Sequence, residues 1–139
     1  MYNFFFIKNC GGYQKLPFSD IIYVEAENKY IKIITENKPY LISATMSQIE
    51  KALPYNQFRR IHRSYIVSFL HISCFDYNVV YLENKQLPIG RQYKTSLLDE
   101  ITVLATDEKN GIILPKDKIK TLSTAIQNGQ FIFPLRVKN

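Results

Sequence analysis

The sequence FRRIHRSYIV at residues 58–67 combines the two features on which the fold and function of this chain depend. It ends in the apolar run Tyr65-Ile66-Val67, and the stretch is expected to form a strand or a short helical turn. Its three arginines and one histidine make it the most basic stretch of the chain. These cationic groups cannot all point into a core, because a buried charge without a partner is costly. Most of them are therefore expected to face water or a binding partner.

Upstream of this stretch, short runs rich in Ile, Val, Phe and Tyr predict β-strands. They lie at residues 4–8, 21–26, 30–35 and 40–44. The polar Glu27-Asn28-Lys29 segment predicts a hairpin between the second and third strands. Thr45, followed three residues later by Gln48, predicts a capping box at the start of a short helix that Pro54 ends. The upstream half therefore predicts an antiparallel sheet with one small helix packed on it.

Downstream, three further strands are predicted before a second helix. The strands lie at residues 71–75, 78–82 and 86–89. Gly90 ends the last strand, and apolar residues at helical spacing predict a helix over residues 91–104. The fold class is therefore mainly β with short flanking helices.

Residues 105–139 differ in character and are treated as a C-terminal extension of unknown role, distinct from a domain over residues 1–104. Ile119, Leu122 and Ile126 share one face of a helix predicted over residues 115–128. The segment at residues 131–137 contains a proline, which favours an edge strand or an extended arm.

The composition excludes several classes of protein. The chain has 139 residues, of which 46% are hydrophobic, so it can bury a core of its own. Cys10, Cys74 and two histidines lack metal-ligand spacing, and no catalytic or phosphate-loop motif is present. The sequence thus predicts no enzyme activity, no metal and no cofactor. No apolar run approaches the ~18 residues that cross a bilayer, so the expected location is the cytoplasm, without a membrane partner.

The net charge of +6 permits binding to a polyanion without requiring it. Asn28 offers an amide for a base edge and Lys29 an ammonium for a phosphate. Arg91 and Lys94 lie in the first turn of the predicted helix, where the dipole disfavours cations by about 0.3 to 1 kcal/mol unless an anion binds there. Taken singly, each of these features is equally compatible with a solvated turn or a solvated basic face.

The chain resembles the LytTR DNA-binding domain over residues 4–104. The resemblance rests on FRRIHRSYIV at residues 58–67, His71-Ile72, LPIGRQYK at residues 87–94, IIYVEA at residues 21–26, and NKY at residues 28–30. It implies an elongated, mostly antiparallel β fold that serves as the output domain of bacterial transcriptional regulators of the LytR/AlgR type. It further implies that loops enter successive major grooves of a direct-repeat site in double-stranded DNA.

The resemblance places DNA contacts at five positions, and two neighbouring basic residues complete the expected set. The expected DNA-binding residues are Asn28, Lys29, Arg60, His62, Arg63, Arg91 and Lys94. Ser68-Phe69 departs from the family's usual Asn-Leu pair. No receiver domain precedes the motif, so the chain is either a stand-alone member or part of a longer regulator with a receiver domain or partner sensor. A homodimer on DNA is compatible with a direct-repeat site.

Two other functions remain open from the residues alone. The ten tyrosines and nine phenylalanines could stack on single-stranded DNA or RNA. Alternatively, the extension could make the chain a protein-interaction module through its apolar helical face and the arm that follows it.

Overall fold

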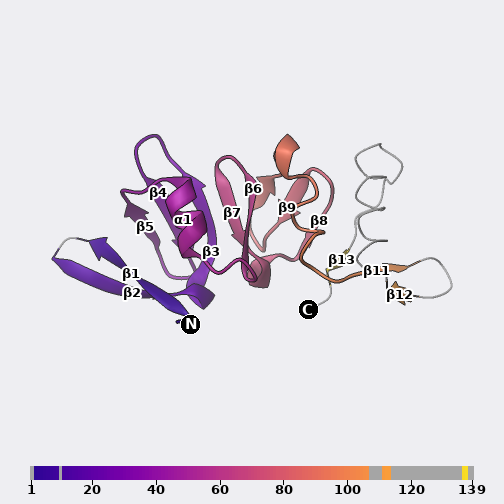
Figure 1. Cartoon of the computed structure of the whole chain (residues 1–139), viewed down its shortest axis with the longest axis horizontal. Coiled ribbons are helices and arrows are strands. Elements are labelled where there is room, and N and C mark those ends of the chain that lie inside the picture. Colours follow the sequence, from indigo (N-terminus) through magenta and orange to yellow (C-terminus); the bar gives the residue numbers. More distant parts are fainter. Residues whose placement is uncertain (1, 10, 107–110, 114–135, 138–139) are drawn as a thin grey trace. The chain divides into compact units, whose positions relative to one another are not determined.

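The computed structural model describes residues 2–9, 11–106, 111–113 and 136–137 of the chain (Figure 1). The chain divides into two compact units, the first ending at His71 and the second beginning at Ile72. In the first unit the elements are β1 (Phe4–Asn9), β2 (Gly12–Pro17), the 3-10 turn η1 (Phe18–Asp20), β3 (Ile21–Ala26), β4 (Ile31–Thr35), β5 (Pro39–Ile42), α1 (Met46–Ala52), β6 (Phe58–His62), β7 (Tyr65–Ser68) and the 3-10 turn η2 (Phe69–His71).

The first unit is built on a five-stranded sheet in the order β5-β4-β3-β7-β6, with every neighbouring pair antiparallel. Val24 of β3 lies in register with Ile33 of β4 and with Ile66 of β7. Paired residues share a face of the sheet, and these three side chains are almost fully buried. This face carries the main core.

Helix α1 lies over that face of the sheet (Figure 1), and the β1–β2 hairpin contributes side chains to the same core cluster. Met46, Ile49 and Leu53 are all buried in the same core cluster, as their helical spacing predicts. Ile7 and Leu16 join the cluster from the inner face of the hairpin. Each such side chain contributes about 1.5 to 3 kcal/mol when it is fully buried.

The second unit contains shorter strands. Its described elements are β8 (Cys74–Phe75), β9 (Val79–Tyr81), β10 (Gln86–Pro88), the 3-10 turn η3 (Arg91–Tyr93), β11 (Val103–Thr106), β12 (Gly111–Ile113) and β13 (Arg136–Val137). They form two antiparallel three-stranded sheets, β10-β9-β8 and β12-β11-β13. The predicted class, mainly β with antiparallel sheets, is confirmed. Within the described part of the chain, no helix has the length and apolar character to span a membrane.

The predicted helix over residues 91–104 is wrong. Only Arg91–Tyr93 form a 3-10 turn, and successive turns follow it. The Ser96 hydroxyl donates to the Tyr93 carbonyl at 2.8 Å, which competes with regular helical hydrogen bonding. From Val103 onward the chain pairs as β11. Leu97 and Leu98 are nevertheless buried, so their apolar spacing reports burial without reporting a helix.

Other boundaries also differ from those that the sequence predicts. The strand β2 was not predicted, and the strand predicted over residues 71–75 is replaced by η2 and the short β8. The helix predicted over residues 115–128 lies outside the described residues. Of the arm predicted at residues 131–137, only β13 is described.

Candidate nucleic-acid interface

The β6–β7 hairpin places two of the expected DNA-binding residues in and beside its turn. His62 pairs with Tyr65, so Arg63 and Ser64 form the turn. The register shifts between Arg60 and His62. These two residues are two positions apart in β6, but their partners in β7, Ile66 and Tyr65, are adjacent. Residues two apart in a regular strand share a face, but this bulge puts Arg60 and His62 on opposite faces of the sheet. The bulge therefore aims the histidine away from the core face.

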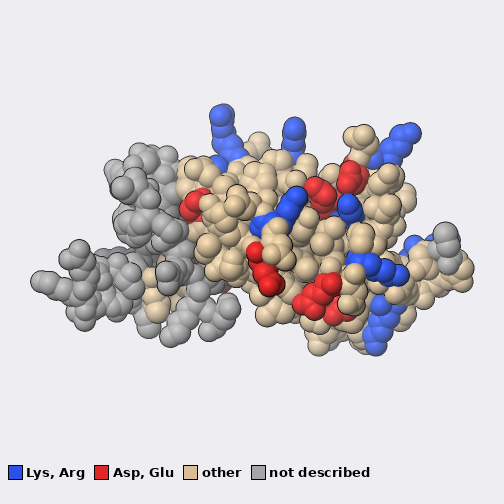
Figure 2. Space-filling model, turned by 180° about the vertical axis from the view of Figure 1, so that it is seen from behind, with Lys and Arg blue, Asp and Glu red and all other residues tan. Residues whose placement is uncertain are grey.

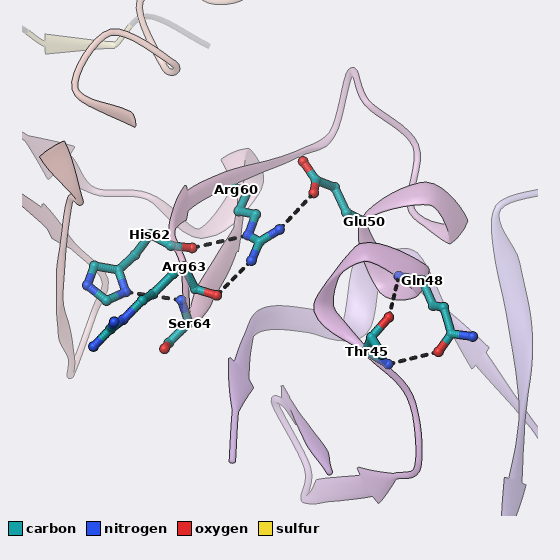
Figure 3. Close-up of polar contacts among 7 residues, drawn as sticks. All are labelled: Thr45, Gln48, Glu50, Arg60, His62, Arg63 and Ser64. Carbon is teal, nitrogen blue, oxygen red and sulfur yellow. Dashed lines mark hydrogen bonds and ion pairs between the residues drawn. The ribbon is translucent and has the colours of Figure 1, made fainter. Parts of the chain in front are cut away.

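Arg60 connects the turn to helix α1 (Figure 3). Its Nε donates to the His62 carbonyl at 3.3 Å, and its Nη2 donates to the Arg63 carbonyl at 2.8 Å. Its Nη1 donates to Glu50 Oε1 of α1 at 3.2 Å, which is also an ion pair. Charge-assisted hydrogen bonds of this kind are stronger than neutral ones. The guanidinium thus stabilises the backbone of the turn through hydrogen bonds to two of its carbonyl groups.

The capping box fixes the helix that carries Glu50. Thr45 Oγ1 accepts from the Gln48 N–H at 3.1 Å, while Gln48 Oε1 accepts from the Thr45 N–H at 2.8 Å. Both contacts satisfy donors that a helix start would otherwise leave unbonded. The prediction of a capping box is confirmed, and its effect is to anchor one end of the connection to Arg60 (Figure 3).

His62 is held in one tautomer. The Ser64 N–H donates to His62 Nδ1 at 3.0 Å, which requires that this nitrogen be unprotonated. The neutral ring therefore carries its proton on Nε2 and presents it as a donor. Burial, followed by the nearby charges of Arg63 and Arg60, lowers the pKa of His62 below its usual value. In Figure 3 the His62 ring and the Arg63 side chain extend away from Glu50.

Because the pKa of His62 is lowered in the folded chain, we expect the folded state to be less stable in mild acid than at neutral pH. Below about pH 6.5 the unfolded chain takes up a proton on this histidine more readily than the folded chain does. The free energy of unfolding should therefore fall between pH 7.5 and 5.5, and level off once the folded ring is protonated. Urea unfolding followed by circular dichroism at both pH values checks this. In His62→Asn the difference between the two pH values should shrink, and an unchanged difference would assign it to other groups.

The β3–β4 loop lies beside the β6–β7 turn. The Glu27 N–H donates to the Tyr30 carbonyl at 2.8 Å and closes the loop, leaving Asn28 and Lys29 exposed. The Ala26 N–H at the end of β3 donates to the Ser64 carbonyl in the β6–β7 turn at 2.9 Å. This hydrogen bond links the two loops at one end of the sheet. The structure thus brings Asn28 and Lys29 together with the pair His62 and Arg63.

Arg59, the remaining arginine of the basic stretch, lies elsewhere. It pairs with Val67, and only 5% of it is exposed. Its guanidinium carbon lies 3.7 Å from the centroid of the Tyr55 ring and 5.8 Å from that of Phe69. Arg59 is therefore buried against aromatic side chains and does not face water, unlike the expectation for most cations of this stretch.

Arg91 and Lys94 belong to the second unit and differ in their exposure and in their hydrogen bonds. Arg91 is exposed in η3. Lys94 is half-buried, and its Nζ donates to Asn78 Oδ1 at 3.1 Å and to the Ile89 carbonyl at 2.9 Å. Burial is the main cause that lowers the pKa of Lys94. No α-helix begins at Arg91, so the argument that a helix dipole calls for an anion there does not hold.

Charge is mixed on the face of the described residues that Figure 2 draws. On the face drawn in Figure 2, the basic side chains are separated by acidic ones and by uncharged areas. Among the described residues, no group of three or more His, Cys, Asp and Glu could hold a metal ion. The candidate interface is defined by the β3–β4 loop and the β6–β7 turn, which the Ala26 to Ser64 hydrogen bond links.

Sequence reasoning missed the part that Glu50 and Ser64 play. Glu50 is ten residues from Arg60 in the chain and lies in a different element. Only the fold brings the two together, so no local pattern could have indicated the pair. Ser64 acts through its backbone N–H, which every residue except proline possesses.

Comparisons with known proteins show what this chain is similar to in sequence and in fold. A family model described as the LytTr DNA-binding domain matches residues 11–102. The chain is similar to the sensory transduction protein LytT of Bacillus subtilis (strain 168), with 32% identity over 84 residues that cover 56% of this chain and 35% of LytT. It is also similar to the CO-responsive transcriptional regulator RcoM of Rhodospirillum rubrum, with 34% identity over 55 residues that cover 40% of this chain and 23% of RcoM.

A solved structure shares the fold. It is the LytTr DNA-binding domain of a putative methyl-accepting/DNA response regulator from Bacillus cereus, with a TM-score of 0.61 and 24% sequence identity. The match covers 70% of this chain and 94% of the solved chain. By contrast, the matched region of this chain spans only about a third of the length of LytT.

Proposed function

This chain belongs to the LytTR family of DNA-binding domains, and from that premise we propose that it binds double-stranded DNA in a sequence-specific manner and thereby regulates transcription. The observation that carries the proposal is the hydrogen bond from Ala26 to Ser64, which holds the β3–β4 loop against the β6–β7 turn. Together these loops offer an amide, an ammonium, an imidazole N–H and a guanidinium at one end of the sheet. Such groups recognise base edges and phosphates.

Each expected contact has a distinct chemical role in this proposal. Asn28 is suited to the adenine edge, and Arg63 to the guanine edge, because both can form paired hydrogen bonds there. Lys29 is suited to phosphate, and the Nε2 proton of His62 can be donated to a phosphate or a base acceptor. Arg91 of the second unit would contact a further base edge, as reading of successive major grooves in a direct-repeat site requires.

For Arg60 and Lys94 we propose a positioning role instead of a direct contact with DNA. Both have cationic groups that donate to acceptors within the chain. We therefore assign them to positioning the β6–β7 turn and the segment around η3, respectively. In this scheme they influence DNA binding through the residues that they hold.

The wider assignment follows from the family and the relatives. We propose that residues 1–104 carry the DNA-binding function, that it involves no catalysis, and that it operates in the cytoplasm. LytT is named a sensory transduction protein and RcoM a CO-responsive regulator, so the proposed regulation involves an input from a receiver domain or a sensor. Binding of two copies to one direct-repeat site is also proposed.

Selection of bound duplexes from a randomised DNA pool at physiological salt tests the proposed function. We expect enrichment of two short repeats about one helical turn, or 10 base pairs, apart. Fluorescence anisotropy should then show weaker competition by single-stranded DNA and RNA of the same sequence. A pool that stays random, with binding that vanishes at modest salt, would indicate general attraction to polyanions and would overturn the proposal.

Lys29→Ala is expected to weaken binding to the selected duplex and to a scrambled duplex equally. A phosphate contact carries no sequence information, and its loss should reduce the slope of log affinity against log salt by about one. Anisotropy titrations at several salt concentrations measure both effects. Lys38→Ala is the matched control, because Lys38 is exposed in the β4–β5 turn at the opposite end of β4. A loss confined to the selected duplex would instead place Lys29 on a base.

Arg60→Met is expected to weaken binding to the selected duplex by about 1 kcal/mol, the order of one hydrogen bond. The salt slope should stay unchanged, because the guanidinium contacts the turn and not a phosphate. Glu50→Gln should cause a smaller loss in the same direction, since the two bonds from Arg60 to backbone carbonyls remain. A reduced salt slope for Arg60→Met, with tighter binding for Glu50→Gln, would show that Arg60 contacts DNA directly.

A further inference from the structure

The β1–β2 hairpin has an outer face that the proposed duplex site does not use. Paired residues in an antiparallel ribbon share a face. Phe4 pairs with Pro17, Phe6 with Lys15, and Lys8 with Tyr13, so these side chains lie together on one face. Ile7 and Leu16 lie on the opposite face and are buried in the core cluster.

The outer face exposes several aromatic rings. Tyr2 is 76% exposed, Phe6 58% and Tyr13 73%. The Tyr2 and Phe4 ring centroids are 5.3 Å apart, and those of Phe4 and Phe6 are 5.9 Å apart. A contiguous exposed apolar patch on a folded protein usually marks an interaction site.

The charge of this face has one sign. Lys15 Nζ lies 4.0 Å from the centroid of the Phe4 ring, and Lys8 is exposed beside Tyr13. The first nineteen residues of the chain contain no Asp or Glu. The occupant that complements such a face presents flat apolar groups together with negative charges.

We propose that this aromatic-lysine face, formed by Tyr2, Phe4, Phe6, Lys8, Tyr13 and Lys15, binds single-stranded nucleic acid. Bases would stack on the exposed rings, and phosphates would lie against the two lysines. Aromatic side chains on adjacent antiparallel strands are a general platform for unpaired bases, and stacking tolerates every base. Two lysines are fewer than the four to eight basic residues typical of attachment to anionic membranes. The site is separate from the loops that would bind duplex DNA, so failure of the proposed function would not remove it.

The test uses the full chain and a fluorescent oligothymidylate of about 15 nucleotides at low salt. The double variant Phe6→Leu, Tyr13→Leu keeps both positions apolar but removes the flat rings. We expect its dissociation constant for the oligonucleotide to rise by about tenfold or more, while its affinity for the selected duplex changes by less than about twofold. Leu41→Ala, at a residue that is also 58% exposed, should leave both affinities unchanged. Thermal unfolding of every variant should match that of the parent chain.

Three results would overturn the proposal. The first is a parent chain that does not bind the oligonucleotide. The second is a double leucine variant that binds it as tightly as the parent chain does. The third is binding to vesicles of phosphatidylcholine and phosphatidylserine that survives in the leucine variant, because this would identify the face as an apolar contact for membranes.

Discussion

Replacing Ile33 with alanine is expected to lower the free energy of unfolding by about 2 to 5 kcal/mol, because the deletion leaves a cavity that the sheet can only partly close. Ile33 is fully buried and lies between Val24 of β3 and Tyr40 of β5. A small domain has about 5 to 15 kcal/mol of stability in total. Urea unfolding followed by circular dichroism measures the loss.

The matched control is Leu41→Ala on the neighbouring strand β5. Leu41 is 58% exposed, so its truncation should change the free energy of unfolding by less than about 0.5 kcal/mol. At a temperature where the Ile33 variant stays folded, its affinity for the selected duplex should equal that of the parent chain. A loss of stability below about 1 kcal/mol for Ile33→Ala would show that the sheet is not packed as described.

The parts of the fold that could be predicted are those with local signals. Thr45 and Gln48 are three residues apart, and their reciprocal bonding follows from that spacing. The central strands β3 and β4 have the sequences IIYVEA and IKIIT, which are rich in β-branched residues. The strand β2 has the sequence GYQKLP, in which only Leu16 is fully buried. It is a strand because β1 pairs with it, and a single-sequence pattern cannot report that pairing.

The residue types of the candidate site could be predicted, but their orientation could not. A basic stretch indicates an anionic partner, whereas the bulge at Ile61 decides that Arg60 faces α1 and His62 faces away. The aromatic-lysine face shows the same limit. Phe5 and Phe6 are adjacent and equally apolar, yet one packs against the core cluster and the other is 58% exposed. Which of them is buried depends on what covers each side of the ribbon.

Arg91→Ala is expected to weaken binding to the selected duplex by about 1 to 3 kcal/mol and to weaken binding to a scrambled duplex by less. Arg91 is exposed in η3, so its guanidinium is accessible to a base edge. Arg91→Lys should lose most of the same discrimination, because an ammonium keeps the charge but cannot form the paired hydrogen bonds of a guanidinium. Anisotropy titrations of both duplexes at one salt concentration measure the difference.

Lys85→Ala supplies the matched control, since Lys85 is an exposed cation in the turn before β10 of the same unit. It should leave the discrimination between the two duplexes intact. Equal losses on both duplexes for Arg91→Ala, with recovery in Arg91→Lys, would place Arg91 on a phosphate. No loss on either duplex would remove η3 from the interface. Sequence discrimination would then rest on the β3–β4 loop and the β6–β7 turn, where the Ala26 to Ser64 hydrogen bond already brings the candidate base-reading groups together.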